Sequence, residues 1–570
     1  MNPASSVKTS PIFYNRFLLC IAGLGGLLYG IDIGIISAAL LYLGKTVDLT
    51  VRQTSAIVAA VLGGSMLSSL IAGFFAEWFG RKKMVILSGL LFVSSVSLIV
   101  LSHGFVSLLL GRLLQGFSGG VIAVVVPLYL AECLSANTRG RGSAVFQFML
   151  TFGILAAAFI GWFYIHQAEA AIHVAANDPA LVRAAEDHAW RGMFLSVIYP
   201  GVIFFAGAFF LSETPRWLFR QGRIEEANIA LRRASSEAES QREMREMEEL
   251  ALENTQAATH TGSLLQRKYV VPFVLACVIL ACNQATGINS VLSYLIVILK
   301  QAGMSANHAA QGDLAVKLLN CVMTIVAIAL IDRKGRKFLL TLGTGGIVLA
   351  LLAIAFFFYG FESHRQDITA EVQREVRENS LKLPSSDIKT WSPQESGATA
   401  LTVLYSYGTG DRMATLVSTY AETLSLVPDP RFPTQQLNIK RAFLSHVPAE
   451  RTGWFITFGL ALFIACFSIG PGVVVWLTLS ELMPTRIRSA GMGIALLLNQ
   501  GVSTLIAGVF LPLVSTYGYY LMFLVWAGCT VVYFITAAFF LPETKGKTLE
   551  EIERQFDPVH SLLPCSTSDN

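Results

Sequence analysis

The chain has 570 residues, of which 54% are hydrophobic and only 14% are charged. An ordinary soluble domain carries roughly 25% charged residues, so this composition excludes a soluble globular enzyme and a disordered protein. The 42 Lys and Arg residues against 38 Asp and Glu give a net charge of +4, which is too balanced to indicate a nucleic-acid partner. With a mean hydropathy of +0.57, these values predict a protein that crosses a lipid bilayer many times.

Apolar segments recur along the chain at lengths suited to a membrane, because a helix needs about 20 apolar residues to cross the hydrocarbon core. The first is too long for a signal-peptide core and runs into further spans, so we expect it to stay uncleaved. The predicted fold is therefore an all-α membrane protein of twelve transmembrane helices. They cover residues 17–43, 55–79, 84–102, 106–131, 143–165, 192–211, 270–299, 312–331, 338–361, 452–479, 487–511 and 519–541.

Basic residues in the short connections predict the orientation of these spans. Lys and Arg follow spans two, four, eight and ten, for example in Arg81-Lys82-Lys83 and at Arg139, whereas the connections at 102–104 and 515–517 have none. We therefore expect the loops after even-numbered spans, and both termini, to face the cytoplasm. The chain has no Asn-x-Ser/Thr sequon, which fits a plasma membrane of the bacterial inner-membrane type.

Polar segments divide the chain further. Residues 1–16 and 542–570 are predicted cytoplasmic tails, which flank six-helix halves at 17–212 and 269–541. Residues 213–268 are charged, and the stretches 223–234 and 240–250 have the pattern of short amphipathic helices on the cytoplasmic side. Residues 362–451 interrupt the second half outside the membrane. Their length predicts either a small ordered cap or a disordered segment.

An internal repeat relates the two halves. Gly80-Arg81-Lys82 after span two recurs as Gly335-Arg336-Lys337 after span eight, each with an acid three residues before its glycine. Two further motifs recur in the same order, after spans four and ten and after spans six and twelve. Two parallel six-span halves with a ligand site between them are the arrangement of major-facilitator transporters.

The repeated motifs place acids and bases at helix ends, where they can pair between helices. We interpret these pairs as cytoplasmic gating charges that form and break during transport. The alternative is that the basic residues serve only to orient the spans. The candidates are Glu77, Arg81, Glu132, Arg139, Glu213, Arg216, Asp332, Arg336, Glu481, Arg488 and Glu543.

Span one carries an acid near its middle, Asp32. Gly26, Gly30 and Gly34 form a smooth stripe for a neighbouring helix, and Asp32 points away from that stripe at about 100° per residue. An intramembrane acid is expensive, so we interpret Asp32 as a proton carrier, the alternative being a structural acid permanently paired with a cation. Arg112 of span four is its natural partner, although it could instead extend toward the outer interface.

Amide side chains cluster in span seven at Asn283, Gln284 and Asn289. Amides donate and accept hydrogen bonds, so they suit the hydroxyl groups of a neutral polyol, whereas the alternative is hydrogen bonding between helices. Gln284 and Asn289 lie about 140° apart on a straight helix, so Gly287 between them could allow local unwinding that brings them together. Single amides elsewhere, and an aromatic residue that suits the C–H face of a sugar, extend the candidate set to Gln147, Asn320, Asn499 and Trp476.

The residues resemble the sugar porter family of the major facilitator superfamily over nearly the whole chain except 362–451. The resemblance implies two six-helix bundles, alternating access, a cytoplasmic helical domain at 213–268, and sugar ligands at Gln147, Gln284, Asn289, Asn320, Trp476 and Asn499. Proton symporters of that family have an acid at the position of Asp32. The motifs that carry the resemblance are those around Gly80–Lys82, Pro127–Glu132, Ser212–Leu218, Gln284–Asn289, Asp332–Lys337 and Pro542–Gly546.

The expectation is therefore a monosaccharide importer driven by proton symport, functional as a monomer, with no cofactor and no metal. The sequence departs from the family pattern at Asn283, where a second Gln is usual, and at Ser293-Tyr294, where paired Tyr is usual. An uncoupled facilitator and a non-transporting sugar receptor that senses through 362–451 are the alternatives. No nucleophile–base pair or metal-ligand spacing indicates an enzyme.

Overall fold

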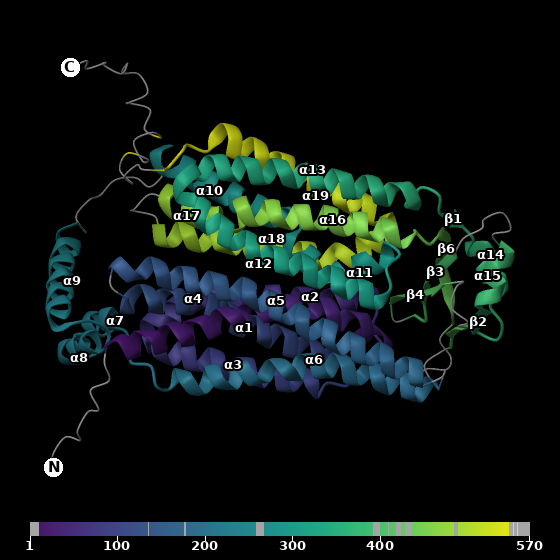
Figure 1. Ribbon diagram of the computed structural model, residues 1–570, viewed down its shortest axis with the longest axis horizontal. Helices are drawn as coiled ribbons and strands as arrows, with labels where there is room; N and C mark the ends of the chain where they lie inside the picture. Colours follow the sequence, from purple (N-terminus) through teal and green to yellow (C-terminus); the bar gives the residue numbers. More distant parts are fainter. Residues whose placement is uncertain are drawn as a thin grey trace, which may run out of the picture.

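The computed structural model describes residues 11–134, 136–175, 178–257, 267–391, 399–408, 410–417, 423–427, 436–483, 488–545, 551 and 556. Two helical bundles lie side by side with their long axes parallel (Figure 1). The purple and blue bundle is the N-terminal half of the chain, and the teal to yellow bundle is the C-terminal half. In the described part of the chain, twelve helical segments are long and apolar enough to cross a membrane, which confirms the predicted number.

The N-terminal bundle contains six of these helices. They are α1 (Pro11–Thr46), α2 (Val51–Phe79), α3 (Arg81–Val100), α4 (Phe105–Cys133), α5 (Ala136–Val174) and α6 (Pro179–Ala208). The C-terminal bundle is built from α10 (Arg267–Ala285), α11 (Ile288–Gln301), α12 (Ala306–Lys334), α13 (Arg336–Glu362), α16 (Glu450–Phe467), the π-helix η1 (Ser468–Gly472), α17 (Val474–Leu482), α18 (Arg488–Tyr517), α19 (Tyr519–Ile535) and the π-helix η2 (Thr536–Phe540).

Local sequence signals set several helix starts. Thr50 and Gln53 form a reciprocal capping box at the start of α2, and the Asp178 side chain caps α6 ahead of Pro179. The α5–α6 hairpin is longer than the predicted spans, which ended at 165 and began again at 192. The helices continue through polar residues there, because the chain keeps good helix formers such as Ala168 after its apolar run ends.

Two membrane spans are broken. Gly287 adopts a left-handed backbone with φ of 83° and separates α10 from α11, which confirms the expected unwinding at this glycine. In the other, η1 widens the helix at Pro471, a residue that cannot donate the hydrogen bond a regular helix requires. Interrupted spans free backbone polar groups, and such groups are tolerated inside a membrane where they are buried in protein or line a cavity.

Three further helices lie together at one end of the bundles (Figure 1). They are α7 (Pro215–Arg220), α8 (Ile224–Ala234) and α9 (Glu237–Ala257), and they confirm the amphipathic helices predicted in this segment. Trp217 and Leu218 of α7 pack against Ala227 and Ala230 of α8. We call this end of the molecule the tail side.

The opposite end carries the segment between α13 and α16, whose described residues form a small folded domain. Its sheet has the antiparallel order β1-β6-β3-β4, and β2 pairs with β5. We call this domain the cap and this end the cap side. Its elements are β1 (Gln366–Asp367), α14 (Thr369–Arg374), β2 (Leu381–Pro384), α15 (Ser385–Trp391), β3 (Thr399–Ser406), β4 (Asp411–Val417), β5 (Thr423–Leu426) and β6 (Asn438–His446).

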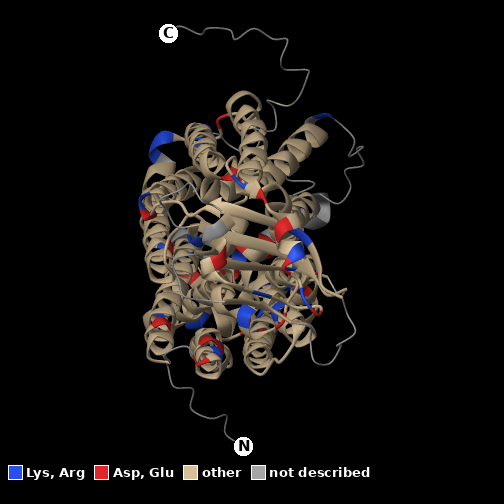
Figure 2. Ribbon diagram, turned by 90° about the vertical axis from the view of Figure 1, so that its right-hand side faces the viewer, with Lys and Arg blue, Asp and Glu red and all other residues tan. Residues whose placement is uncertain are grey.

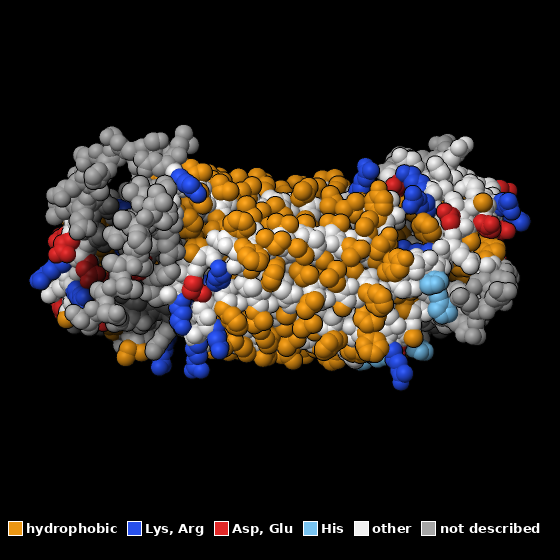
Figure 3. All heavy atoms as spheres, turned by 90° about the horizontal axis from the view of Figure 1, so that it is seen from above, with side chains coloured by type: hydrophobic (Ala, Val, Ile, Leu, Met, Phe, Trp, Pro, Cys, Tyr) orange, Lys and Arg blue, Asp and Glu red, His pale blue; other side chains and the backbone are white. Residues whose placement is uncertain are grey.

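Hydrophobic side chains form a broad band around the middle of the molecule, and charged side chains gather at its two ends (Figure 3). Figure 2, which looks onto the cap, shows acidic and basic residues on the cap. This distribution is the one a bilayer requires of a spanning protein, so the structure is that of a multi-pass membrane protein.

The two bundles meet mainly toward the cap side. Hydrogen bonds link α1 to α11 and α12 through Ser37, and Gly508 of α18 faces Ala59 of α2. Among the described residues, the hydrogen bonds between the bundles lie between the middle of the membrane and the cap. The chain is therefore closed on the cap side in this structure.

Candidate functional site

Asp32 lies in the interior of the N-terminal bundle with only 1% of its surface exposed. Among the described residues, neither of its carboxylate oxygens has a hydrogen-bond partner. A Cβ on Gly119 of α4 would stand 3.4 Å from Asp32 Oδ2, so the glycine leaves room for the carboxylate against that helix. A buried acid without a hydrogen bond is costly, and such groups mark functional positions in membrane helices.

The cation that interacts electrostatically with Asp32 is Arg112 of α4, and it too is 1% exposed. Its guanidinium does not form an ion pair with Asp32. Instead it donates to Gln115 Oε1 at 2.7 Å and stacks over the ring of Phe194. This burial is inconsistent with the alternative that Arg112 extends to the outer interface. The two groups still interact electrostatically, so the role of Asp32 as a proton carrier stays a prediction.

The glycine stripe of α1 fixes the helix that carries Asp32. A Cβ on Gly30 would lie 1.9 Å from the Leu150 carbonyl oxygen of α5, and one on Gly26 would lie 2.5 Å from that of Phe146. These distances leave no space for a side chain, so α1 and α5 pack backbone to backbone. Asp32 consequently points to the other side of α1, as the sequence spacing predicts.

Three of the predicted amides form a hydrogen-bonded set in the C-terminal bundle. Asn289 Nδ2 donates to Gln284 Oε1 at 2.9 Å and to Ser503 Oγ at 2.8 Å. Gln284 Nε2 donates to Asn499 Oδ1 at 3.3 Å, and Asn499 Nδ2 donates to the Leu280 carbonyl oxygen at 3.0 Å. The break at Gly287 therefore brings Gln284 and Asn289 together, and α18 supplies the third amide.

The other sugar-site candidates lie outside this set. Asn320 Oδ1 accepts from Ser468 of η1 at 2.7 Å, and Gln147 of α5 is half-buried on the opposite bundle. Asn283 is buried, and its Oδ1 has no partner among the described residues. Trp476 in α17 is 39% exposed and makes no hydrogen bond to the amides in the described structure. Gln284, Asn289 and Asn499 are therefore bonded to one another, whereas the Asn283 side-chain oxygen has no described hydrogen-bond donor.

A charge network joins helix ends on the tail side of the N-terminal bundle. Arg81 pairs with Glu77 at 2.6 Å and with Glu132 at 2.9 Å. Glu213 accepts from the backbone N–H groups of Arg81 and Lys82, which places a carboxylate at the start of α3. Burial raises the pKa of the Glu213 carboxyl, and these backbone donors oppose the rise.

The C-terminal bundle repeats this network. Arg336 pairs with Glu481 at 3.2 Å, and Glu543 accepts from the backbone N–H groups of Arg336 and Lys337. Thr544 Oγ1 donates to Glu481 Oε2 at 2.6 Å, just as Thr214 Oγ1 donates to Glu132 Oε2 at 2.6 Å in the first half. The described pairs of both networks join helices within one half of the chain, so a role in gating stays a prediction.

Some predicted gating charges are not part of these pairs. Arg216 is half-buried and forms no ion pair within the part of the chain that the structure describes. The side chains of Arg139, Asp332 and Arg488 lie outside the described residues. Arg220 of α7 was not predicted, yet it pairs with Glu77 at 3.0 Å and with Glu132 at 2.7 Å. Its position one turn after Arg216 on a short helix was the signal that could have found it.

A second buried charge pair was also missed. Asp313 and Lys317 of α12 pair at 2.8 Å, with side chains 1% and 0% exposed. Both residues lie inside a membrane span, because α12 begins at Ala306. The sequence interpretation started that span at residue 312, which put Asp313 at a helix end where an acid is unremarkable.

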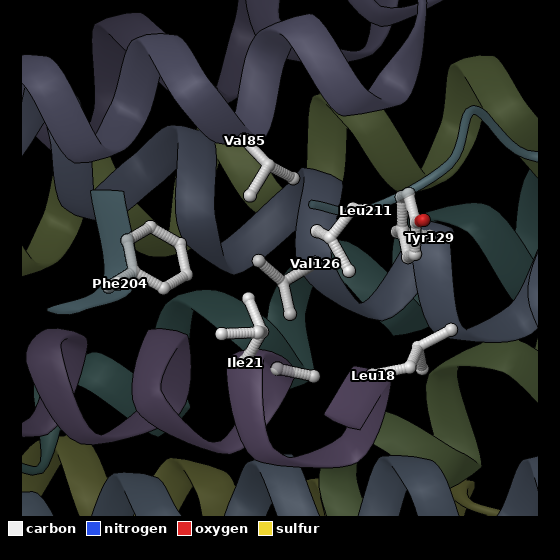
Figure 4. A pocket seen from close by; sticks show the side chains of 8 residues that line it. Leu18, Ile21, Val85, Val126, Tyr129, Phe204 and Leu211 are labelled. Atoms are coloured by element: carbon white, nitrogen blue, oxygen red, sulfur yellow. The ribbon is translucent and has the colours of Figure 1, made fainter. Parts of the chain in front are cut away.

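A small cavity inside the N-terminal bundle is unsuited to a sugar (Figure 4). Its free volume is about 10 Å³, and its lining is apolar except for the tyrosine hydroxyl. That hydroxyl, on Tyr129, donates to the Ser212 carbonyl oxygen. The lining residues are Leu18, Ile21, Ala22, Val85, Val126, Tyr129, Phe204 and Leu211.

The two pseudo-symmetric bundles and their repeated charge networks define a transporter of the major facilitator fold. The model of the family described as "Sugar (and other) transporter" matches residues 18–370 and 441–556. The chain therefore belongs to this family and is a transporter, not an enzyme. The match omits residues 371–440, which form most of the cap.

Relatives and solved structures agree with this assignment. The chain is 28% identical over 543 residues to the glucose transporter GlcP of Staphylococcus epidermidis, covering 95% of this chain and 97% of that protein. It is 27% identical to the proton myo-inositol cotransporter of Homo sapiens, covering 96% of this chain and 82% of that protein. The xylose transporter XylE from E. coli, in an inward-open conformation, superposes with a TM-score of 0.66 at 20% identity, covering 95% of this chain and 99% of XylE.

Proposed function

We propose that this protein imports a monosaccharide or a related polyol by alternating access and couples the import to proton symport through Asp32. The observation that supports coupling is the burial of Asp32 without a hydrogen bond or an ion pair among the described residues. A carboxylate held this way changes its energy strongly when it binds a proton, so protonation can bias the conformation of the carrier.

The amide set supports the proposed substrate class. Gln284, Asn289 and Asn499 come from α10, α11 and α18, and each offers donors and acceptors at fixed positions. A neutral hydroxylated ligand can exchange hydrogen bonds with such groups without bringing a charge into the membrane. Relatives that carry glucose and myo-inositol are consistent with this class.

The proposed orientation places the tail side in the cytoplasm and the cap outside, in a plasma membrane of the bacterial inner-membrane type. Basic residues of the described tail-side connections, such as Arg81, Lys82 and Lys337, support this assignment through the positive-inside rule. In this orientation the structure is closed to the outside. One chain supplies both bundles and the whole amide set, so we propose that the monomer is the functional unit.

Uptake by purified protein in proteoliposomes tests the coupling. With an inward proton gradient we expect glucose, xylose or myo-inositol to accumulate above its external concentration, and with Asp32→Asn we expect equilibration only. Counterflow exchange should survive in Asp32→Asn, since exchange needs no net proton movement, and this control shows that the variant is folded. Accumulation that persists in Asp32→Asn contradicts coupling through this residue, and equilibration without accumulation in the wild type identifies a facilitator.

A further inference from the structure

A buried charge pair, Asp313 and Lys317, joins the bundles on the cap side and belongs to neither the proposed proton site nor the amide set. Lys317 Nζ of α12 donates to the Gly34 carbonyl oxygen of α1 at 3.1 Å and to Asp313 Oδ2 at 2.8 Å. Ser37 Oγ of α1 donates to Asp313 Oδ1 at 3.2 Å and accepts from the Ile296 N–H of α11 at 3.3 Å. Five polar groups from three helices thus meet across the boundary between the bundles.

The pair is not needed to hold α12 together. Two charges buried in a membrane span are expensive, and a hydrophobic pair of similar volume is often as stable or more stable. The same two charges, however, are both bonded to α1, which belongs to the other bundle. What they provide beyond neutralising one another is a set of directional bonds between the bundles.

The attachment point on α1 lies next to the proposed proton site. Gly34 and Ser37 follow Asp32 by two and five residues on one continuous helix, and α1 is locked against α5 by its glycine stripe. A rotation or tilt of α1 driven at Asp32 therefore moves the Gly34 carbonyl and the Ser37 hydroxyl with it. On the other side, Asn320, a candidate sugar ligand, lies three residues after Lys317 on α12.

We propose that Asp313 and Lys317 are positioning residues that form a latch with Gly34 and Ser37, closing the cap side and linking that closure to the protonation of Asp32. Opening on the cap side separates α1 from α12, so these bonds break and the charged pair becomes solvated. The free energy needed to break these bonds sets the fraction of molecules that are open on the cap side. This inference rests on the proposed alternating access, and it assigns the latch to residues that the family motifs do not contain.

Ser37→Ala tests the latch without disturbing either charge. It removes the bonds to Asp313 and to the Ile296 N–H, and a loss of two hydrogen bonds predicts an increase of about ten-fold in the ratio of cap-open to cap-closed molecules. Ser290→Ala is the matched control, because Ser290 is equally buried on α11 and its hydroxyl has no partner in the described structure.

The readout is the distance between spin labels at the exposed positions Arg52 and Tyr517, which lie at the cap-side ends of α2 and α18. All eight native cysteines are replaced by serine in every variant, so that the labels attach only at these two positions. In Ser37→Ala we expect an additional population of molecules with a longer distance between the labels. In Ser290→Ala we expect the wild-type distance distribution. Unchanged distances in Ser37→Ala overturn the latch.

A double variant separates a latch from a purely structural pair. Asp313→Leu with Lys317→Met replaces both charged side chains with apolar ones of similar shape, so we expect thermal stability in detergent to be retained while the long-distance population grows. Retained stability with an unchanged distance distribution overturns the proposal, as does a distance change that occurs only in protein that has lost stability. These distances are measured without substrate, so failure of sugar uptake in the wild type refutes the proposed function separately.

Discussion

Asn289 connects the two halves of the broken span to the neighbouring helix. Its side-chain amide nitrogen bonds both Gln284 of α10 and Ser503 of α18, although Asn289 itself belongs to α11. In the proposed sugar site, a hydroxyl of the ligand would replace one of these bonds with another of similar strength, so binding would exchange partners rather than bury an unsatisfied group. This explains how an amide set can be hydrogen-bonded without ligand and still be suited to bind one.

Asn289→Ala is expected to weaken the binding of the transported sugar by about ten-fold, since it removes at least one hydrogen bond to the ligand and loosens Gln284. Half-saturation of counterflow in proteoliposomes is the measurement. Asn307→Ala, which removes an amide at the cap-side start of α12, is the control and should leave it unchanged. Equal half-saturation in wild type and Asn289→Ala would show that the amides serve only to join helices.

The interior position of Asp32 could be predicted from the sequence, because it lies near the middle of an apolar span and away from the glycine stripe, and the structure buries it. Its role as a proton carrier stays a prediction. Asp313 and Lys317 were missed because the predicted span began at residue 312, which put both in its first two turns, where charged residues are unremarkable. The helix begins two turns earlier, at Ala306, so the pair lies deeper in the span than the sequence indicated.

At the scale of elements, three helices begin in the same way, with a glycine just before the helix and a glutamate bonded to its first N–H groups. Gly80, Gly335 and Gly518 have φ values of 94°, 89° and 90°, and each directly precedes a helix whose first N–H groups bond a glutamate from elsewhere in the chain. The glutamates are Glu213, Glu543 and Glu362. Each carboxylate satisfies helix N–H groups that have no intrahelical partner and complements the positive end of the helix dipole.

Gly287 is the element-scale feature on which the amide set depends. Its φ of 83° disfavours any side chain, and a Cβ there would lie 2.3 Å from the Trp526 ring. We expect Gly287→Ala to lower stability by about 1–3 kcal/mol and to weaken sugar binding, because it forces α10 and α11 apart or into one helix. Thermal unfolding in detergent and counterflow half-saturation measure the two effects.

Gly73→Ala is the matched control for this change. Gly73 lies inside α2, and a Cβ added there would have no described atom within 4 Å, so alanine should be neutral or slightly stabilising. A Gly287→Ala protein as stable as the Gly73→Ala protein, with unchanged sugar binding, would contradict a role for the break.

At the scale of the whole molecule, the internal repeat predicted the two bundles, and the structure repeats it down to matched pairs such as Arg81–Glu132 and Arg336–Glu481. Whether residues 362–451 fold into a domain could not be predicted, because the segment is polar and contains several prolines, a composition that suits both a folded cap and a disordered segment. The side on which the bundles touch could not be predicted either, since both states of an alternating carrier are encoded by one sequence and differ by small free energies.

The cap itself adds a contact between the bundles. It is continuous with α13 and α16 of the C-terminal bundle, and Arg441 donates to the Thr516 carbonyl oxygen there. Across the boundary, Arg412 of β4 forms a two-pronged ion pair with Asp48, in the α1–α2 connection, at 2.8 and 2.7 Å. Asp48 must therefore leave Arg412 when the bundles part on the cap side, unless the cap moves with the N-terminal bundle.

This ion pair is partly exposed, with 54% of the Asp48 side chain accessible, so its contribution depends on salt in a way that the buried Asp313–Lys317 pair does not. We expect Asp48→Asn to increase the cap-open population by up to about five-fold at low ionic strength, and raising the salt toward about 1 M to abolish the difference from wild type. Distances between spin labels at Arg52 and Tyr517 report that population. The exchanged pair, Asp48→Arg with Arg412→Asp, should restore the wild-type distances at low salt. If Asp48→Asn matches wild type at every ionic strength, the cap rests on the N-terminal bundle without holding it, and closure on this side belongs to the membrane-embedded contacts alone.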